Sequence, residues 1–457
     1  MKNIRRPPTA LFITICAIMI GIVTAGWLLW PVPSSLNVKI VVTLWPLIAC
    51  LLCKRFLLRD IGGEYILLAA WCTVTLGAIC NGWYYTTAMG GTVSDPVFAN
   101  YDSMRDWEHS TALLAGESTL ATYGYIVRLL RLAYDDVMVV IGFNVMCYLL
   151  TIVIIGRITF ELTEDKRTVV ISMLMTALIA YLWAQATTVI KDAPVALCMS
   201  VLTLLFIRWR RLDEDRVGYI FGVFVLMILA FLRINAIFMV ALMAVVICTG
   251  TGKKKTYLVF MIVVCCFAAY LIAALAGVHN PSPISLIAVA PDAEAVMADQ
   301  HTAPWDNMLG GDYTALPLYM KLLWLPASVV LQFLLPFPWD FESAYIFGPA
   351  KIFARIGVVW YYCGALLLWW LAKQWRQASG TTRRVVLCGI LLTIITAYMN
   401  SGRASRYCLA YLPMLLPASA MACNYLRQPS MRRWLIIFTV LLIATLLICY
   451  HLHKPWI

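Results

Sequence analysis

Ionisable residues concentrate in one polar stretch, residues 95–125, that lies between two long apolar runs. Its acids and its histidine are Asp95, Asp102, Asp106, Glu108, His109 and Glu117. If the stretch is helical, Asp102, Asp106 and His109 share one face and Glu108 lies off it. One carboxylate held toward an acceptor hydroxyl can act as a general base, and two or more together can bind a divalent cation. Asp102, Asp106 and Glu108 are therefore candidate catalytic residues; the simpler interpretation is a solvated acidic face on a large loop.

Positive charges interrupt or border apolar runs elsewhere in the chain. Arg233 divides a long apolar run, where an arginine inside the bilayer would cost about 2.5–3.5 kcal/mol. Arg403 and Arg406 are three residues apart, so on a helix they share a face and could bind one phosphate together. The simpler interpretations are a hairpin tip that reaches water for Arg233 and interfacial snorkelling for the pair. The remaining polar candidates are Lys191, a possible phosphate ligand or half of a local ion pair, and Asp192, Asn235 and His301.

The composition indicates a polytopic helical membrane protein. The 457 residues are 62% hydrophobic and 13% charged, whereas soluble domains carry roughly 25% charged residues. Many apolar runs reach the ~18 residues expected of a membrane helix, which is not the alternating pattern of a β-barrel. The net charge of +12 lies mostly in short Lys/Arg clusters between these runs, as in cytoplasmic loops, and we expect no nucleic-acid partner. The 15 cysteines are scattered through apolar segments, so we expect neither disulfides nor a zinc site.

One membrane-embedded domain, residues 1–457, is expected to hold about 13 transmembrane helices. The predicted spans are residues 10–30, 37–53, 64–82, 136–156, 168–189, 193–208, 217–232, 236–250, 256–277, 356–372, 385–399, 407–425 and 434–450. Two outer loops interrupt them: residues 83–134, with the acidic stretch and amphipathic helices, and residues 278–353, with a re-entrant or interfacial hairpin. The Lys/Arg clusters mark the cytoplasmic side. This topology puts all the polar candidates on the outer face, which is the main sign of a functional site.

Four motifs resemble, in this order, those of the GT-C superfamily of integral-membrane glycosyltransferases, especially the bacterial branch near the protein O-mannosyltransferases and the lipid A aminoarabinose transferase. They are YDSMRDWEHSTALLAGE (101–117), KDAPVALCMSVLTLLF (191–206), FLRINAIFMVAL (231–242) and SRYCLAYLPMLLP (405–417). The resemblance implies a GT-C-like fold and transfer of a sugar from a polyprenyl-phosphate-linked donor. It implies Asp102 as the base, Arg403 and Arg406 on the donor phosphate, and Arg233 and Lys191 as supporting cations.

The same resemblance sets the expected surroundings of the protein. It implies a bacterial inner (plasma) membrane, an active site on the non-cytoplasmic side and membrane lipids as neighbours. Because the sequence shows no separate soluble outer domain, we expect a glycan or a lipid as the acceptor and not a large protein. No cofactor is certain, although the acidic stretch could hold a divalent cation. One alternative function is a polysaccharide polymerase or ligase that uses lipid-linked oligosaccharide. Another is a lipid or sugar transporter, which should show inverted repeats and broken helices that meet at the midplane.

Overall fold

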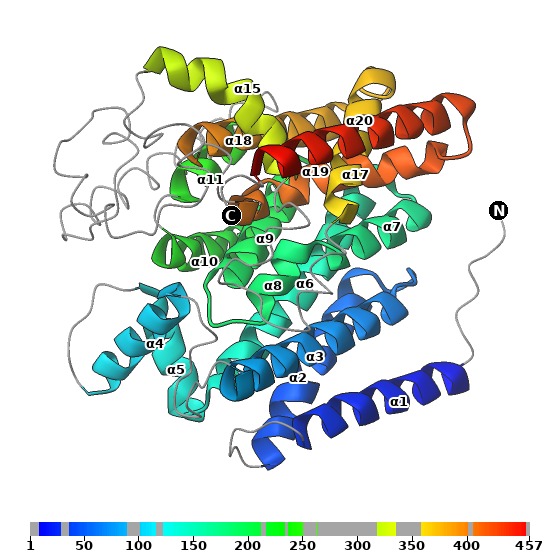
Figure 1. The fold of residues 1–457 in the computed structure, drawn as a ribbon. Helices are drawn as coiled ribbons and strands as arrows, with labels where there is room; N and C mark the ends of the chain where they lie inside the picture. Colours follow the sequence, from blue (N-terminus) through cyan, green and yellow to red (C-terminus); the bar gives the residue numbers. More distant parts are fainter. Residues whose placement is uncertain are drawn as a thin grey trace.

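A computed structural model describes residues 9–28, 36–88, 101–115, 122–211, 216–233, 236–249, 262, 318–334, 358–400 and 405–453. Within these ranges the chain is helical apart from short connections, and the helices pack side by side in a bundle (Figure 1). For this part of the chain, the all-α fold class expected from the composition is confirmed.

The helices follow the apolar runs of the sequence closely. They are α1 (Thr9–Leu28), α2 (Leu36–Leu57), α3 (Glu64–Ala88), α4 (Tyr101–Leu114), α5 (Thr122–Ala133), α6 (Val137–Thr163), α7 (Lys166–Ala177), α8 (Ala180–Ala186), α9 (Asp192–Arg211), α10 (Arg216–Leu232), α11 (Ala236–Cys248), α15 (Leu318–Leu334), α17 (Val358–Lys373), α18 (Gly380–Asn400), the 3₁₀ segment η3 (Ser405–Ala410), α19 (Leu412–Ala422), the 3₁₀ segment η4 (Cys423–Tyr425) and α20 (Pro429–His453). The predicted span at 256–277 and most of the predicted loop at 278–353 lie outside the described residues; within that loop the structure describes α15.

Several helices are suited to cross a membrane. Five described segments are long and apolar enough: Glu64–Asn81, Val137–Thr163, Asp192–Arg210, Gly380–Tyr398 and Pro429–Ile448. A sixth span results if α7 and α8, which meet at a bend of 59°, count as one. Shorter apolar helices accompany them in α1, α10, α11 and α15. The chain is thus a helical membrane protein, and the expected total of 13 spans exceeds what the described residues establish.

The central element of the bundle is α6, which packs against α2, α7 and α9 and is buried along most of its length. The helices α2 and α6 approach closely at Gly142, where a Cβ atom would lie 2.5 Å from Val42 Cγ1 and 3.2 Å from Val42 O. Small residues let membrane helices approach closely, and van der Waals packing then holds them together in lipid. α6 therefore fixes the positions of the neighbouring helices that carry polar residues.

The C-terminal end of α6 differs from the prediction. The sequence predicted a span that ends at residue 156. The helix instead continues to Thr163, and Arg157 Nη2 pairs with Glu161 Oε1 at 2.6 Å, one turn later on the same face, which supports the additional turns. Asp165 then starts α7 as its N-cap and accepts from two backbone N–H groups.

The segment predicted as a span at 168–189 consists of two helices, α7 and α8, which meet at a bend of 59° and together are long and apolar enough to form one broken span. Past α8, backbone carbonyl groups without a helical partner are satisfied by Asn144 of α6. Its Nδ2 donates to Thr188 O at 2.6 Å and to Ile190 O at 3.0 Å. Irregular backbone at membrane depth is stable only where protein groups satisfy it. Asn144 thus supports the break.

Arginines gather at one end of the bundle and bind the last carbonyls of neighbouring helices. Arg157 Nη1 donates to Leu57 O at 2.9 Å, Arg210 Nη1 to Ile247 O at 2.8 Å, and Arg384 Nη1 to Thr249 O at 2.6 Å. The final carbonyls of a helix lack intrahelical partners and carry the negative end of its dipole, so guanidinium groups stabilise them. We call this end of the bundle the arginine-capped end.

Candidate functional site

The acidic stretch contains α4, which packs on the amphipathic helix α5. Arg131 of α5 is 8% exposed and joins the two helices. Its Nη1 donates to Ser110 Oγ and Thr111 Oγ1, both at 2.8 Å, and its guanidinium carbon lies 4.0 Å from the centre of the Trp107 ring. Asp135 Oδ1 also accepts a hydrogen bond from Arg131 Nε at 2.6 Å. The amphipathic helix expected here is present, but Arg131 binds α4 and thereby fixes the acidic helix.

α5 in turn is attached to the end of the bundle opposite the arginine-capped end; α4 and α5 lie together at the left in Figure 1. Tyr123 OH donates to Asn144 Oδ1 at 3.1 Å, beside the break after α8. The ring of Tyr125 lies 5.7 Å from that of Phe231, two residues before Arg233. The acidic helix and Arg233 are therefore attached to the same end of the molecule.

Asp192 and Arg233 form an ion pair between the first residue of α9 and the residue that follows α10. Asp192 Oδ1 lies 3.3 Å from Arg233 Nη2, and the two side chains are 2% and 19% exposed. Asp192 therefore pairs across two helices, and Arg233 is largely covered by protein. Burial of a carboxylate is expensive unless a positive charge or hydrogen bonds compensate. Because Oδ1 accepts no hydrogen bond, it retains the capacity to bind a donor.

The segment η3, which carries Arg406, packs against α8, α9, α15 and α18. The thiol of Cys408 in η3 lies within electrostatic range of the Asp192 carboxylate. Tyr411, directly after η3, donates its OH to Gln332 Oε1 of α15 at 3.1 Å. The fold thus brings the second, third and fourth motifs together around Asp192, and α5 attaches the first motif to the same end.

Some candidate site residues are described with their side chains, others only by their place in a helix, and three are not described. Glu108 is exposed on α4, and Lys191 is half-buried directly before α9. Asp102, Asp106 and His109 lie in α4 and Arg406 lies in η3, but their side chains are outside the described residues. Arg403, Asn235 and His301 lie outside them altogether.

Several polar residues of this end were not anticipated from the sequence. Tyr123, Tyr411 and Gln332 are buried and hydrogen-bonded across helices, and Asn81 Nδ2 donates to Thr187 Oγ1 at 3.1 Å. The available signal was an amide or phenol inside an apolar run, which is weak because many such groups serve packing alone. Among the side chains that the structure describes, no group of three or more His, Cys, Asp and Glu could hold a metal ion.

No protein-family model matches the chain, and no curated protein matches it significantly. The resemblance to glycosyltransferases thus depends on the four motifs.

Proposed function

We propose that the protein is a membrane glycosyltransferase that moves a sugar from a polyprenyl-phosphate-linked donor to a glycan or lipid acceptor. The proposal is carried by the convergence at Asp192, where Arg233 and η3 meet, and where α5 attaches the acidic helix α4 nearby. The arginine-capped end lies opposite, and cytoplasmic segments of membrane proteins are enriched in Lys and Arg. In this proposal the end of the bundle that holds Asp192 and Arg233 therefore faces away from the cytoplasm.

In the proposed reaction the cations bind the donor phosphate and an acid of α4 activates the acceptor. The phosphate leaves the sugar with growing negative charge, which preorganised guanidinium groups stabilise. Asp192 holds Arg233 in place for this role, and η3 brings Arg406 to the same region. A carboxylate that takes the proton of the acceptor hydroxyl contributes about 10²–10⁴-fold to the rate. Asp102, implied by the family resemblance, is the first candidate, with Asp106 and Glu108 beside it.

The test is a transfer assay with the purified full-length protein in phospholipid nanodiscs and polyprenyl-phosphate sugars as donors. Asp102→Asn, Asp106→Asn and Glu108→Gln are compared, and we expect turnover to fall about 10²–10⁴-fold in the variant that lacks the base. Arg233→Gln should raise the KM for the donor, because it removes a charge-assisted contact to phosphate. Glu164→Gln, an exposed acid at the arginine-capped end, is the matched control and should keep wild-type turnover.

Two results contradict the proposal: no transfer from any polyprenyl-phosphate sugar, or the same turnover in all three acid variants. Transfer from lipid-linked oligosaccharide alone would instead indicate a polymerase or ligase.

A transporter is the second candidate, and the bend between α7 and α8 favours it. Broken helices with unwound backbone are a recurring feature of substrate sites in secondary transporters. Here, however, Asn144 already occupies the carbonyls of Thr188 and Ile190. Movement of a labelled lipid-linked sugar across proteoliposomes, without chemical change and without an acceptor, would establish this function in place of transfer.

A further inference from the structure

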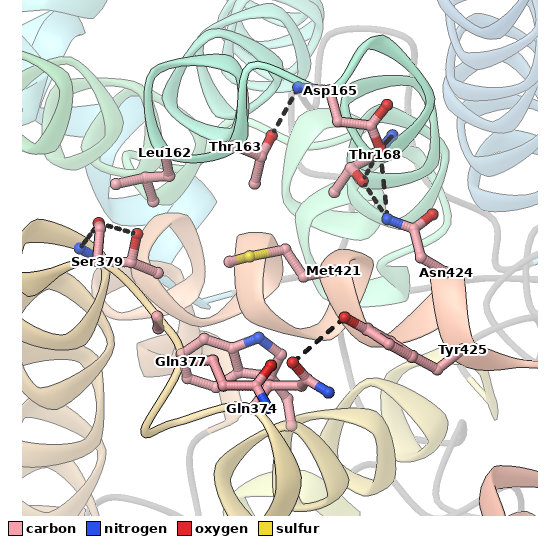
Figure 2. A pocket seen from close by; sticks show the side chains of 13 residues that line it. Leu162, Thr163, Asp165, Thr168, Gln374, Gln377, Ser379, Met421, Asn424 and Tyr425 are labelled. Atoms are coloured by element: carbon pink, nitrogen blue, oxygen red, sulfur yellow. Dashed lines mark hydrogen bonds between the residues drawn. The ribbon is translucent and has the colours of Figure 1, made fainter. Parts of the chain in front are cut away.

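A cavity of about 350 Å³ lies at the arginine-capped end, far along α7 and α8 from Asp192 (Figure 2). Three segments that are distant in the sequence line it: the junction of α6 and α7, the junction of α17 and α18, and the end of α19 with η4. Small-molecule sites have volumes of about 300–1,000 Å³, so this cavity suits a small ligand. No residue of the proposed transferase site lines it.

One wall of the cavity is a hydrogen-bonded group of Asp165, Thr168 and Asn424 (Figure 2). Asn424 Nδ2 donates to Thr168 Oγ1 at 2.7 Å and to Asp165 Oδ2 at 3.3 Å. A carboxylate only accepts, so this bond fixes the amide orientation and leaves Asn424 Oδ1 free to accept from a ligand. Asp165 Oδ1 accepts a single bond, from the backbone N–H of Arg167 at 3.2 Å, and also has spare capacity.

The opposite wall consists of Gln374, Gln377 and Tyr425 (Figure 2). Tyr425 OH donates to Gln374 Oε1 at 3.2 Å, which leaves both N–H donors of that amide available. The Gln377 side chain has no hydrogen bond within the described part of the chain and is exposed at the rim. The cavity therefore presents free acceptors on one wall and free donors on the other, with the rings of Tyr425 and Trp370 in its lining.

The charges in the lining argue against an ionic ligand. Asp165 is the only charged side chain among the described lining residues. Burial by itself raises the pKa of Asp165, but hydrogen bonds from Thr168, from the backbone of Arg167 and Thr168, and from Asn424 outweigh burial and hold the pKa below its usual value. The carboxylate is thus ionised at neutral pH and repels anions. A single carboxylate with neutral amides and hydroxyls is a sparse ligand set for Ca²⁺, which takes six to eight oxygen ligands.

We propose that this cavity binds a neutral, hydroxyl-rich ligand of monosaccharide size. Sugar hydroxyls both donate and accept, so one ring can satisfy the acceptors of Asn424 and Asp165 and the donors of Gln374 and Gln377 together. The C–H face of a sugar ring is apolar and fits against the aromatic part of the lining. The site is separate from the proposed transferase site and does not depend on transferase activity.

The test is ligand-observed NMR on the full-length protein in phospholipid nanodiscs, since detergents with sugar headgroups would compete. The probes are D-glucose, D-mannose and N-acetyl-D-glucosamine, with inorganic phosphate as the anionic comparison. We expect at least one sugar to bind with a Kd of about 1 mM and phosphate not to compete. Gln374→Ala and Gln377→Ala should each weaken binding about 2- to 10-fold, the loss of one or two neutral hydrogen bonds.

The matched control is Gln428→Ala, which removes an exposed glutamine at the same end but outside the cavity and should leave the Kd unchanged. Gln377→Trp, a rim substitution that blocks the entrance, should abolish binding without disturbing a hydrogen bond between described residues. A glucosyl diacylglycerol incorporated in the nanodisc bilayer that displaces free glucose would identify a glycolipid headgroup as the source; without displacement the ligand is a free sugar. The proposal is overturned if no sugar binds, if phosphate binds in preference, or if both Gln374→Ala and Gln377→Trp leave the Kd unchanged.

Discussion

At the scale of single residues, arginines of the described part of the chain make three different kinds of contact. Arg384 caps the carbonyls that end α11, Arg131 joins α4 to α5, and Arg233 pairs with the buried carboxylate of Asp192. The sequence environment of each is an arginine beside apolar residues, so residue type does not distinguish them. What distinguishes them is the group that each guanidinium contacts: backbone carbonyls for Arg384, hydroxyl groups and an aromatic ring for Arg131, and a buried carboxylate for Arg233.

A double-mutant cycle on Asp192 and Arg233 tests whether this ion pair contributes to the free energy of unfolding. Asp192→Asn should lower the free energy of unfolding by about 1–3 kcal/mol, because the guanidinium of Arg233, 19% exposed, loses a carboxylate partner that is itself 2% exposed. Arg233→Gln should lower it similarly, and the double variant should lose less than the sum, with a coupling of about 0.5–3 kcal/mol. The measurement is reversible unfolding in mixed micelles followed by tryptophan fluorescence.

Strict additivity of the two substitutions would show that the pair contributes nothing to stability, despite its 3.3 Å separation. The assignment of Arg233 as a residue positioned by Asp192 would then lose its basis.

At the scale of elements, close helix approach decides where the polar groups lie. α6 contacts α2, α7 and α9, and its Asn144 holds the backbone that follows α8. If α2 moved away from α6, the contacts that bury α6 would loosen along its length. The narrowest point of this packing is Gly142 against Val42.

Gly142→Ala should therefore destabilise the protein by about 1–3 kcal/mol, because the new methyl group would overlap Val42 Cγ1 and crowd Val42 O. A backbone oxygen cannot rotate away as a side chain can. Val42→Ala in the Gly142→Ala background should recover part of the loss. The comparison is Gly21→Ala in α1, where no atom of another described element lies within 4 Å of the added Cβ and the alanine should be neutral or stabilising by up to ~1 kcal/mol. The measurement is the melting temperature of each variant relative to the wild type. Equal changes for Gly142→Ala and Gly21→Ala would show that α2 and α6 are not closely packed at Gly142.

At the scale of the whole molecule, the two ends of the bundle differ in chemistry. One end has guanidinium groups on helix C-termini and the amide-lined cavity. The other has the ion pair, the α4–α5 hairpin and the buried amides and phenols. Such an asymmetry is expected when one end remains in the cytoplasm and the other faces the opposite compartment.

Accessibility of introduced cysteines should report this asymmetry directly. Glu108→Cys on α4 and Gln428→Cys beside η4 are exposed positions at opposite ends. A membrane-impermeant maleimide should modify Glu108→Cys in intact cells and Gln428→Cys only after the membrane is opened. The native cysteines are the background, and most of those described are buried. Modification of both positions from the same side would contradict the proposed orientation.

The sequence by itself determined the helices and the grouping of basic residues at helix ends. Apolar run length and flanking Lys/Arg are local properties, so the boundaries of α1, α10 and α11 agree with prediction within a few residues. The predicted end of α6 at residue 156 is too early, because the prediction ends the helix where charged residues begin. Arg157 instead pairs with Glu161 within α6. Which of the acids of α4 acts on a substrate remains a prediction from the sequence.

Tertiary structure alone decided the partners of the polar groups. The residues in the contacts of Asp192 with Arg233 and of Asn144 with Ile190 are separated by more than forty positions in the sequence. Asn424 is further still from Asp165, its partner in the cavity wall. The break between α7 and α8 has the same origin, because its released carbonyls are satisfied from another helix. Local sequence patterns specify which groups are polar and on which helix they lie; the packing of helices in three dimensions specifies which of those groups meet.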